Sequence, residues 1–269
     1  MAFVIRSLYN YYQEAFYDAQ DPRTIGFLLM DPPWLSFAIC AVYLYFVLNL
    51  GPKLMANRKP LDLRKPLMVY NILQVIANIY LAYFGTKVMI EINLTFDCRP
   101  VDRSTSQVAL REVQLVHRYY LLKLADLVDT VFFILRKKHN QVSFLHVYHH
   151  AMMVMAPFFY ARNYPGGHGS LLGLANTYVH AVMYFYFFLS VWRPNWTKDL
   201  RWKKCVTIFQ MIQFVAMAFW FGRPALLEYD CGIPRYWFWA GTIQSIFMFA
   251  MFADFYIKAY GVKKVNKKE

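Results

Sequence analysis

The chain has 269 residues, of which 58% are hydrophobic and 17% are charged, and its formal net charge is +13. Soluble domains carry roughly 45–50% apolar and about 25% charged residues, so this composition excludes a disordered chain and argues against an ordinary soluble globule. Four cysteines in this length exclude a small disulfide-built scaffold. The positive charge lies between apolar blocks, which favours a membrane protein over a nucleic-acid-binding protein.

The apolar residues gather in blocks close to 20 residues long, the length that crosses a bilayer as a helix. Backbone groups must be satisfied internally in lipid, so blocks of this length predict helices rather than barrel strands. We therefore predict one all-α membrane domain, residues 1–269, with seven transmembrane helices. The seven blocks are 34–50, 67–84, 113–135, 144–160, 171–192, 205–221 and 236–257.

Lys and Arg in the connections predict the orientation. Segments 51–66, 136–142, 193–204 and 258–269 carry eighteen of them, and the other four segments carry nine. The first set should be cytosolic, which leaves a luminal N-terminus and a basic cytosolic tail, 258–269. Cys98 and Cys231 then both fall in luminal segments, where a disulfide can persist. We expect this bond, and the alternative is two free thiols.

The third block contains ionisable residues at helical spacing, Lys123, Asp126 and Asp129, followed by Thr130. Ionisable groups inside membrane helices are costly and usually functional. A structural pair of the lysine with one carboxylate is the alternative. Such a pair explains one carboxylate only, so function is favoured for Asp129, and both interpretations stay open for Asp126.

The fourth block opens with three histidines in five residues, and helical spacing places His146 on one face with both His149 and His150. A satisfied buried or interfacial cluster is the alternative, but three histidines near a membrane boundary favour function. The fifth and sixth blocks also contain polar residues, and such residues often form hydrogen bonds between membrane helices. That role is favoured for the Thr and Gln side chains but not for the histidine of the fifth block. These residues are Asn176, His180 and Tyr184 in the fifth block, and Thr207, Gln210 and Gln213 in the sixth.

The polar faces of four helices are expected to surround one cavity that opens to the cytosol near His149. The basic residues beside that opening suit a phosphate-bearing head with an apolar tail, although the positive-inside bias alone also explains them. These residues are Arg136, Lys137, Lys138, Lys198, Arg201, Lys203 and Lys204.

Two chemistries fit the histidines. Imidazole binds iron, but di-iron membrane desaturases and hydroxylases use more histidines, in three boxes, than the seven of this chain. A single metal held by three histidines stays open. A neutral imidazole is otherwise a nucleophile toward an acyl thioester. Cys40 and Cys205 lie outside the polar groups, which disfavours them as nucleophiles.

Taken in order, the motifs resemble those of the membrane fatty-acid elongases, the condensing enzymes of very-long-chain fatty-acid synthesis, over essentially the whole chain. Asp126 stands where that family usually has Glu, which keeps the carboxylate but shortens its reach. The matching stretches are Leu50-Gly51-Pro52-Lys53, Asn57-Arg58-Lys59-Pro60, Lys123 to Thr130, Leu135-Arg136-Lys137-Lys138, the HxxHH box His146 to His150, the HxxMY stretch His180 to Tyr184, and TxxQxxQ from Thr207 to Gln213.

The resemblance implies six or seven helices around a narrow tunnel and a ping-pong condensation of long-chain acyl-CoA with malonyl-CoA. It implies that His149 carries the acyl group, that His180 binds or polarises the malonyl unit, and that His146, His150 and Asp129 orient rings and tune protonation. Chain length would depend on the luminal end of the tunnel, lined by residues of 151–175 and 214–250. The implied substrate-binding residues are Lys123, Asp126, Asn176, Tyr184, Gln210, Gln213, Arg136, Lys138, Lys203 and Lys204.

The resemblance also implies no metal and no redox cofactor, because the reductions of the cycle belong to partner reductase and dehydratase enzymes. It implies a multi-pass protein of the endoplasmic reticulum membrane, in contact with lipid, compatible with a homo-oligomer and without a nucleic-acid partner. The alternatives are a metal-dependent desaturase or hydroxylase with a histidine box, and a seven-span receptor or transporter without enzymatic activity.

Overall fold

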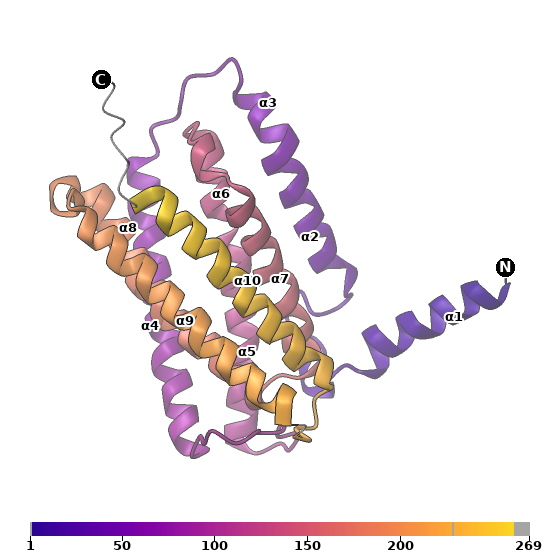
Figure 1. Cartoon of the computed structure of the whole chain (residues 1–269). Coiled ribbons are helices and arrows are strands. Elements are labelled where there is room, and N and C mark those ends of the chain that lie inside the picture. The colour runs from indigo at the N-terminus through magenta and orange to yellow at the C-terminus, as the bar shows by residue number, and fades with distance from the viewer. Residues whose placement is uncertain (1, 228, 261–269) are drawn as a thin grey trace, which may run out of the picture.

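The computed structural model describes residues 2–227 and 229–260, and every regular element in that part of the chain is helical (Figure 1). The predicted all-α class is therefore confirmed. Most of the expected basic tail, from residue 261 onward, lies outside the described residues. The α-helices are α1 (Ala2–Gln13), α2 (Trp34–Tyr45), α3 (Gly51–Met55), α4 (Arg64–Glu91), α5 (Gln107–Asp126), α6 (Val128–Leu135), α7 (Phe144–Asn163), α8 (Ser170–Trp192), α9 (Leu200–Leu227) and α10 (Arg235–Tyr260). Shorter helical turns are η1 (Glu14–Asp18), η2 (Pro22–Thr24), η3 (Phe46–Leu50), η4 (His139–Gln141), η5 (Gly167–Gly169) and η6 (Pro194–Thr197).

Helices α2 to α10 form one bundle, from which α1 projects to the side (Figure 1). The main pairs are α4 with α8, α5 with α7, and α9 with α10. The connections that follow α3, α6 and α8 lie at the end where α10 finishes, and those that follow α4, α7 and α9 lie at the opposite end (Figure 1). The two sets of segments that differ in Lys and Arg content are thus at opposite ends of the bundle.

Five helices are long and apolar enough to cross a membrane by length and composition. The predicted count of seven is not confirmed, because α5 carries five charged residues and α7 carries three histidines and an arginine. The five are Trp34–Met55, Arg64–Glu91, Gly167–Trp192, Leu200–Leu227 and Arg235–Tyr260.

Helix α4 carries three polar side chains among the apolar ones that it buries in the bundle, and it exposes apolar side chains outside it. Asn71, Gln74 and Asn78 are at most 3% exposed, whereas Leu73 and Ile76 are more than half exposed. In water such an apolar outer face would be costly. It is the arrangement expected of a helix that meets lipid with one face and other helices with the other.

The structure corrects the predicted extent of the first block and the predicted continuity of the third. Gly51 and Pro52, expected in a connection, begin α3 and extend the first span to Met55. The π-helical turn η3 precedes them, because proline has no N–H to give the carbonyl four residues earlier. The third block is two helices, broken at Leu127, rather than one.

The connections at the end of the bundle that follows α4, α7 and α9 are tied together. Cys98 and Cys231 form a disulfide with their Cα atoms 5.5 Å apart. Arg162, fully buried at the end of α7, pairs with Asp31 and donates to the backbone carbonyl of Phe16. The N-terminal segment and the two cysteine-bearing connections are therefore fixed at one end.

Candidate active site

A buried ion pair lies at the break between α5 and α6. Lys123 Nζ donates to Asp126 Oδ2 at 2.8 Å and lies 3.2 Å from His180 Nδ1. The same Nδ1 lies 3.4 Å from Asp126 Oδ2. A charged Lys123 has no lone pair, so toward the ammonium group His180 Nδ1 acts as the acceptor. The lysine–carboxylate pair, which was the structural alternative for Asp126, is thus present, and His180 contacts it through Nδ1.

Two carboxylates share one tyrosine hydroxyl. The Tyr184 hydroxyl lies 2.6 Å from Asp129 Oδ2 and 3.1 Å from Asp126 Oδ1. It has a single proton and cannot donate to both carboxylates at once. Tyr184, Asp126 and Asp129 therefore form one coupled group, in which the protonation of one carboxyl affects the other.

The histidine box occupies the first turns of α7, which begins after the N-cap Ser143, whose Oγ accepts from the His146 N–H at 3.3 Å. The Nε2 of His146 lies 2.9 Å from the Thr130 hydroxyl, and the ring centroids of His146 and His150 are 4.2 Å apart. The ring of His149 is nearly perpendicular to that of His150. His150 thus lies between the other two rings, packed against His146 and in edge contact with His149.

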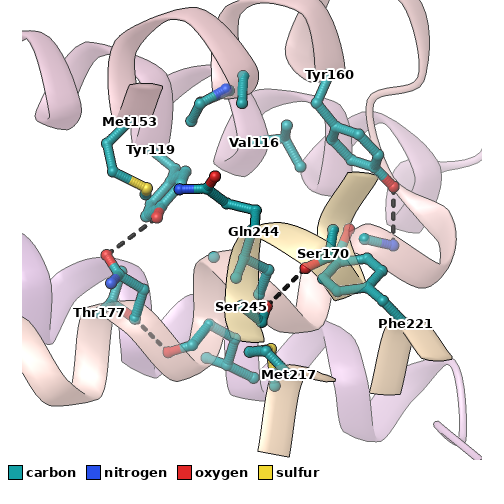
Figure 2. Close-up of a pocket in the computed structure, with 18 of the residues that line it drawn as sticks. Val116, Tyr119, Met153, Tyr160, Ser170, Thr177, Met217, Phe221, Gln244 and Ser245 are labelled. Carbon is teal, nitrogen blue, oxygen red and sulfur yellow. Dashed lines mark hydrogen bonds between the residues drawn. The ribbon is translucent and has the colours of Figure 1, made fainter. Parts of the chain in front are cut away.

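His149 lines an apolar cavity of about 260 Å³ that extends among α4, α5, α7, α8, α9 and α10. Figure 2 shows lining side chains from α5, α7, α8, α9 and α10. Asn176 and Gln213 line it too, and the Asn176 amide oxygen accepts from the Tyr119 hydroxyl at 3.0 Å. Lys123 Nζ lies 5.0 Å from the centroid of the Tyr119 ring. The Tyr119 ring thus lines the cavity and also contacts the lysine of the ion pair.

The expected tunnel-lining ranges both contribute to this cavity. Residues of 151–175 include Met152, Ala156 and Tyr160, and residues of 214–250 include Met217 and Phe238. Helices α4 and α5, which the sequence did not single out for the tunnel, supply a further wall. Its members include Leu81, Gly85, Val88, Met89, Glu112 and Val116.

The basic residues are not brought onto the polar cluster. Arg136 and Lys138 follow α6, and Lys203 and Lys204 lie in the first turn of α9, at the same end of the bundle. Lys204 Nζ lies over the ring of Tyr260 and Lys203 is exposed. Gln210 donates to the sulfur of Met183 rather than facing the cavity. This group forms an outer rim rather than the site itself.

Two residues of α4 were missed by sequence reasoning. Gln74 Nε2 donates to Asp126 Oδ1 at 3.0 Å and to the Tyr70 hydroxyl at 3.0 Å. The signal was present, because Asn71, Gln74 and Asn78 repeat at spacings of three and four in an otherwise apolar helix.

The arrangement supports acyl chemistry on an imidazole. A neutral imidazole can attack an acyl group, and the apolar cavity beside His149 offers space for a chain. Among the described residues, no three His, Cys, Asp or Glu side chains converge as ligands of one metal ion. The hydrogen bonds of His146 and His180 go instead to Thr130 and to the ion pair.

The chain is similar to proteins of one family. The model of the GNS1/SUR4 family matches residues 28–269. A very long chain fatty acid elongase of Aedes aegypti is 41% identical over 248 residues, which cover 91% of this chain and 68% of that protein. Very long chain fatty acid elongase 7 of Rattus norvegicus is 40% identical, over 89% of this chain and 85% of that protein. Very long chain fatty acid elongase 1 of Homo sapiens is 39% identical, over 95% of this chain and 91% of that protein.

Proposed function

Because the chain belongs to the GNS1/SUR4 family and is a very long chain fatty acid elongase, we propose that it is an acyltransferase that condenses long-chain acyl-CoA with malonyl-CoA, forming 3-ketoacyl-CoA, CO2 and CoA. The observation that supports this reaction best is the position of His149, whose ring lines the apolar cavity together with Tyr119, the residue that contacts Lys123 of the ion pair. The site offers a nucleophile, space for an acyl tail and a fixed cationic group.

In the first half-reaction, a ring nitrogen of His149 attacks the thioester carbonyl of acyl-CoA. A carbon–nitrogen bond forms, the carbon–sulfur bond breaks, and the ring proton goes to the departing thiolate to give CoA. The acyl-imidazole that results stays reactive, so a second nucleophile can collect the acyl group. The rings of His146 and His150 hold His149 in place.

In the second half-reaction, malonyl-CoA loses CO2 and its enolate carbon attacks the acyl carbonyl. A carbon–carbon bond forms, the bond to His149 breaks, and the released ring nitrogen takes up a proton. The Nε2–H of His180, whose Nδ1 faces Lys123, is proposed to stabilise the enolate oxygen. The carboxylates behind it, Asp126 and Asp129, hold the lysine and Tyr184 in place.

The rim residues Arg136, Lys138, Lys203 and Lys204 are proposed to meet the phosphates of CoA at the cytosolic end of the bundle. In this orientation α5 with α6, and also α7, cross the membrane as well, which gives seven spans with a luminal N-terminus. We place the enzyme in the endoplasmic reticulum. A condensation needs no redox cofactor, so a reductase and a dehydratase complete the cycle as partners, and a homo-oligomer is compatible with this role.

The test is a condensation assay with purified full-length protein, malonyl-CoA and acyl-CoAs of graded length, without NADPH. We expect 3-ketoacyl-CoA by mass spectrometry and a transient acyl adduct on the protein. His149→Ala should lower product formation by about a thousandfold or more, as loss of a nucleophile does. Cys205→Ser should retain the adduct, because Cys205 is exposed and outside the cavity.

Two results would contradict the proposal. An adduct that survives His149→Ala but disappears in Cys205→Ser would exclude the imidazole route. No 3-ketoacyl-CoA from folded protein with any acyl-CoA, together with stoichiometric iron or zinc, would favour a metal-dependent oxidoreductase.

A further inference from the structure

One end of the cavity that His149 lines carries polar groups among its apolar ones. We call this end the cavity floor and define it by Glu112, Tyr160, Gly169 and Ser170, which all line the cavity. Glu112 is only 3% exposed. Tyr160 lies eleven positions after His149 in α7, about 16 Å at the helical rise, so the floor faces the far end of a chain attached at His149.

The hydroxyl protons of the floor are already used. Ser170 Oγ donates to Glu112 Oε1 at 2.7 Å, and the Tyr160 hydroxyl donates to the Gly166 carbonyl. The Tyr160 oxygen in turn accepts from the Gly169 N–H at 2.8 Å (Figure 2).

Acceptor capacity remains on the same atoms. A hydroxyl oxygen has two lone pairs, and a carboxylate has about four sites, of which Glu112 uses one for Ser170 and one for Arg99. Within the described residues, no donor reaches Ser170 Oγ. The floor therefore presents acceptors to the cavity and lacks a free hydroxyl donor.

The floor is held rigidly from behind. Arg99, which does not line the cavity, forms an ion pair with Glu112, and its carbonyl accepts from the His168 N–H at 2.9 Å. The neighbouring Cys98 is bonded to Cys231. A Cβ atom at Gly169 would collide with the ring of Tyr160, so glycine is required there. The acceptors thus keep their positions rather than turning away.

We propose that the floor is a binding site for the hydroxyl group of ω-hydroxyacyl-CoA, a substrate class with an alcohol at the end remote from the thioester. This inference rests on the proposed function. An ω-hydroxyl would donate its proton to Ser170 Oγ, whose own proton goes to Glu112, and so would not be left unpaired in an apolar cavity. An ω-carboxylate has no proton to donate and meets the charge of Glu112, so it is rejected.

The experiment compares plain, ω-hydroxy and ω-carboxy acyl-CoAs of matched and graded length in the condensation assay. We expect the kcat/KM of the ω-hydroxy substrate to be within a few-fold of the plain one at the length that reaches the floor. An unpaired hydroxyl would instead lower it about tenfold to a hundredfold. The ω-carboxy substrate should be poor at that length.

Ser170→Ala should lower the ratio of ω-hydroxy to plain kcat/KM by about tenfold, since it removes one acceptor. The matched control is Thr177→Val, which removes a cavity-lining hydroxyl two helical turns nearer to His149 and should leave the ratio as it is. Comparing ratios within each variant keeps the test valid where a variant is less stable.

Rejection of ω-hydroxyacyl-CoA at every length by an enzyme that elongates plain chains would overturn this inference alone. Equal ratios in wild type and Ser170→Ala would also overturn it. No product with plain chains would instead refute the proposed function.

Discussion

At the scale of single residues, Asp126 connects three helices. Its carboxylate accepts from Lys123 of α5 and Gln74 of α4, and it shares the Tyr184 hydroxyl of α8 with Asp129. Asp126→Asn leaves the buried ammonium without its counter-charge, and removal of one partner of a buried pair costs about 3–5 kcal/mol. We expect a large loss of stability and of condensation activity, measured by thermal unfolding in detergent and by product formation.

Asp126→Glu is the matched control, because it keeps the charge and adds one methylene. Overpacking costs about 1–3 kcal/mol, so this variant should fold and keep activity within about tenfold of wild type. Complete inactivity of Asp126→Glu in folded protein would show that the shorter reach of aspartate is required. Wild-type stability of Asp126→Asn would contradict the importance of the charge.

Asp21 gives a prediction on pH dependence outside the membrane spans. Burial alone would raise the pKa of Asp21, but hydrogen bonds from Arg23 and the charges of Arg23 and Arg103 outweigh it and lower the pKa below its ordinary value of 3.8. A lowered pKa means that the carboxylate stabilises the fold above the unfolded pKa, and that this contribution is lost as the pH falls through the folded pKa.

We therefore expect wild-type stability to fall below about pH 4 more steeply than that of Asp21→Asn. Unfolding temperatures measured across this range in detergent check it. Parallel curves for both proteins would contradict the prediction.

Single residues also show how far sequence reasoning reaches. The histidine box and the Lys123–Asp126 pair were found because charge and imidazole in an apolar segment are conspicuous. The acceptor role of Asp126 toward Gln74 was not predicted, since it depends on how α4 packs beside α5. The role of Glu112 at the cavity floor was likewise hidden, because a lone Glu near a helix start resembles a surface residue.

At the scale of elements, the start of α7 determines where the three histidines point. Ser143 is the N-cap, and its hydroxyl accepts from the His146 N–H. Ser143→Ala should cost about 1 kcal/mol and lower the condensation rate, because the first turn carries His146 and His149. Ser143→Asp restores a capping oxygen and should recover most of the loss. Equal activity of both variants and wild type would show that packing alone positions this turn.

The break between α5 and α6 could not be predicted from the sequence. No proline or glycine occurs near Leu127, and the block reads as one apolar helix. The carbonyl of Ala125, at the end of α5, accepts from the Tyr70 hydroxyl at 3.2 Å. A side chain of another helix thus satisfies a terminal carbonyl, so the break depends on tertiary structure.

At the scale of the whole molecule, the disulfide closes a loop of 133 residues. Bonds that close long loops stabilise by about 2–5 kcal/mol, chiefly by restricting the unfolded chain. We expect Cys98→Ala with Cys231→Ala to unfold at a lower temperature than wild type, and reductant to lower the wild-type value but not that of the double variant. Cys205→Ser is the control for thiol loss. A double variant as stable as wild type would refute this contribution.

The global plan was more predictable than the site. Helical class and five of the spans follow from block length and hydropathy, which are local properties. The two spans left unconfirmed are α5 together with α6, and α7. Both carry polar residues of the candidate site, and these residues lower the hydropathy by which a span is recognised. Helix α1 was not expected, and its projection from the bundle follows from no periodicity in the sequence.

The bond between Cys98 and Cys231 also has a consequence for biosynthesis. Both histidine motifs are made before residue 231 leaves the ribosome, and the α9–α10 hairpin comes last. Ile233, Trp237 and Phe238 of this final hairpin line the cavity. A nascent chain that ends before these three residues would contain every proposed catalytic group but would lack part of the wall of the acyl-binding cavity. The acyl-binding cavity is therefore completed only after all the proposed catalytic residues have been synthesised.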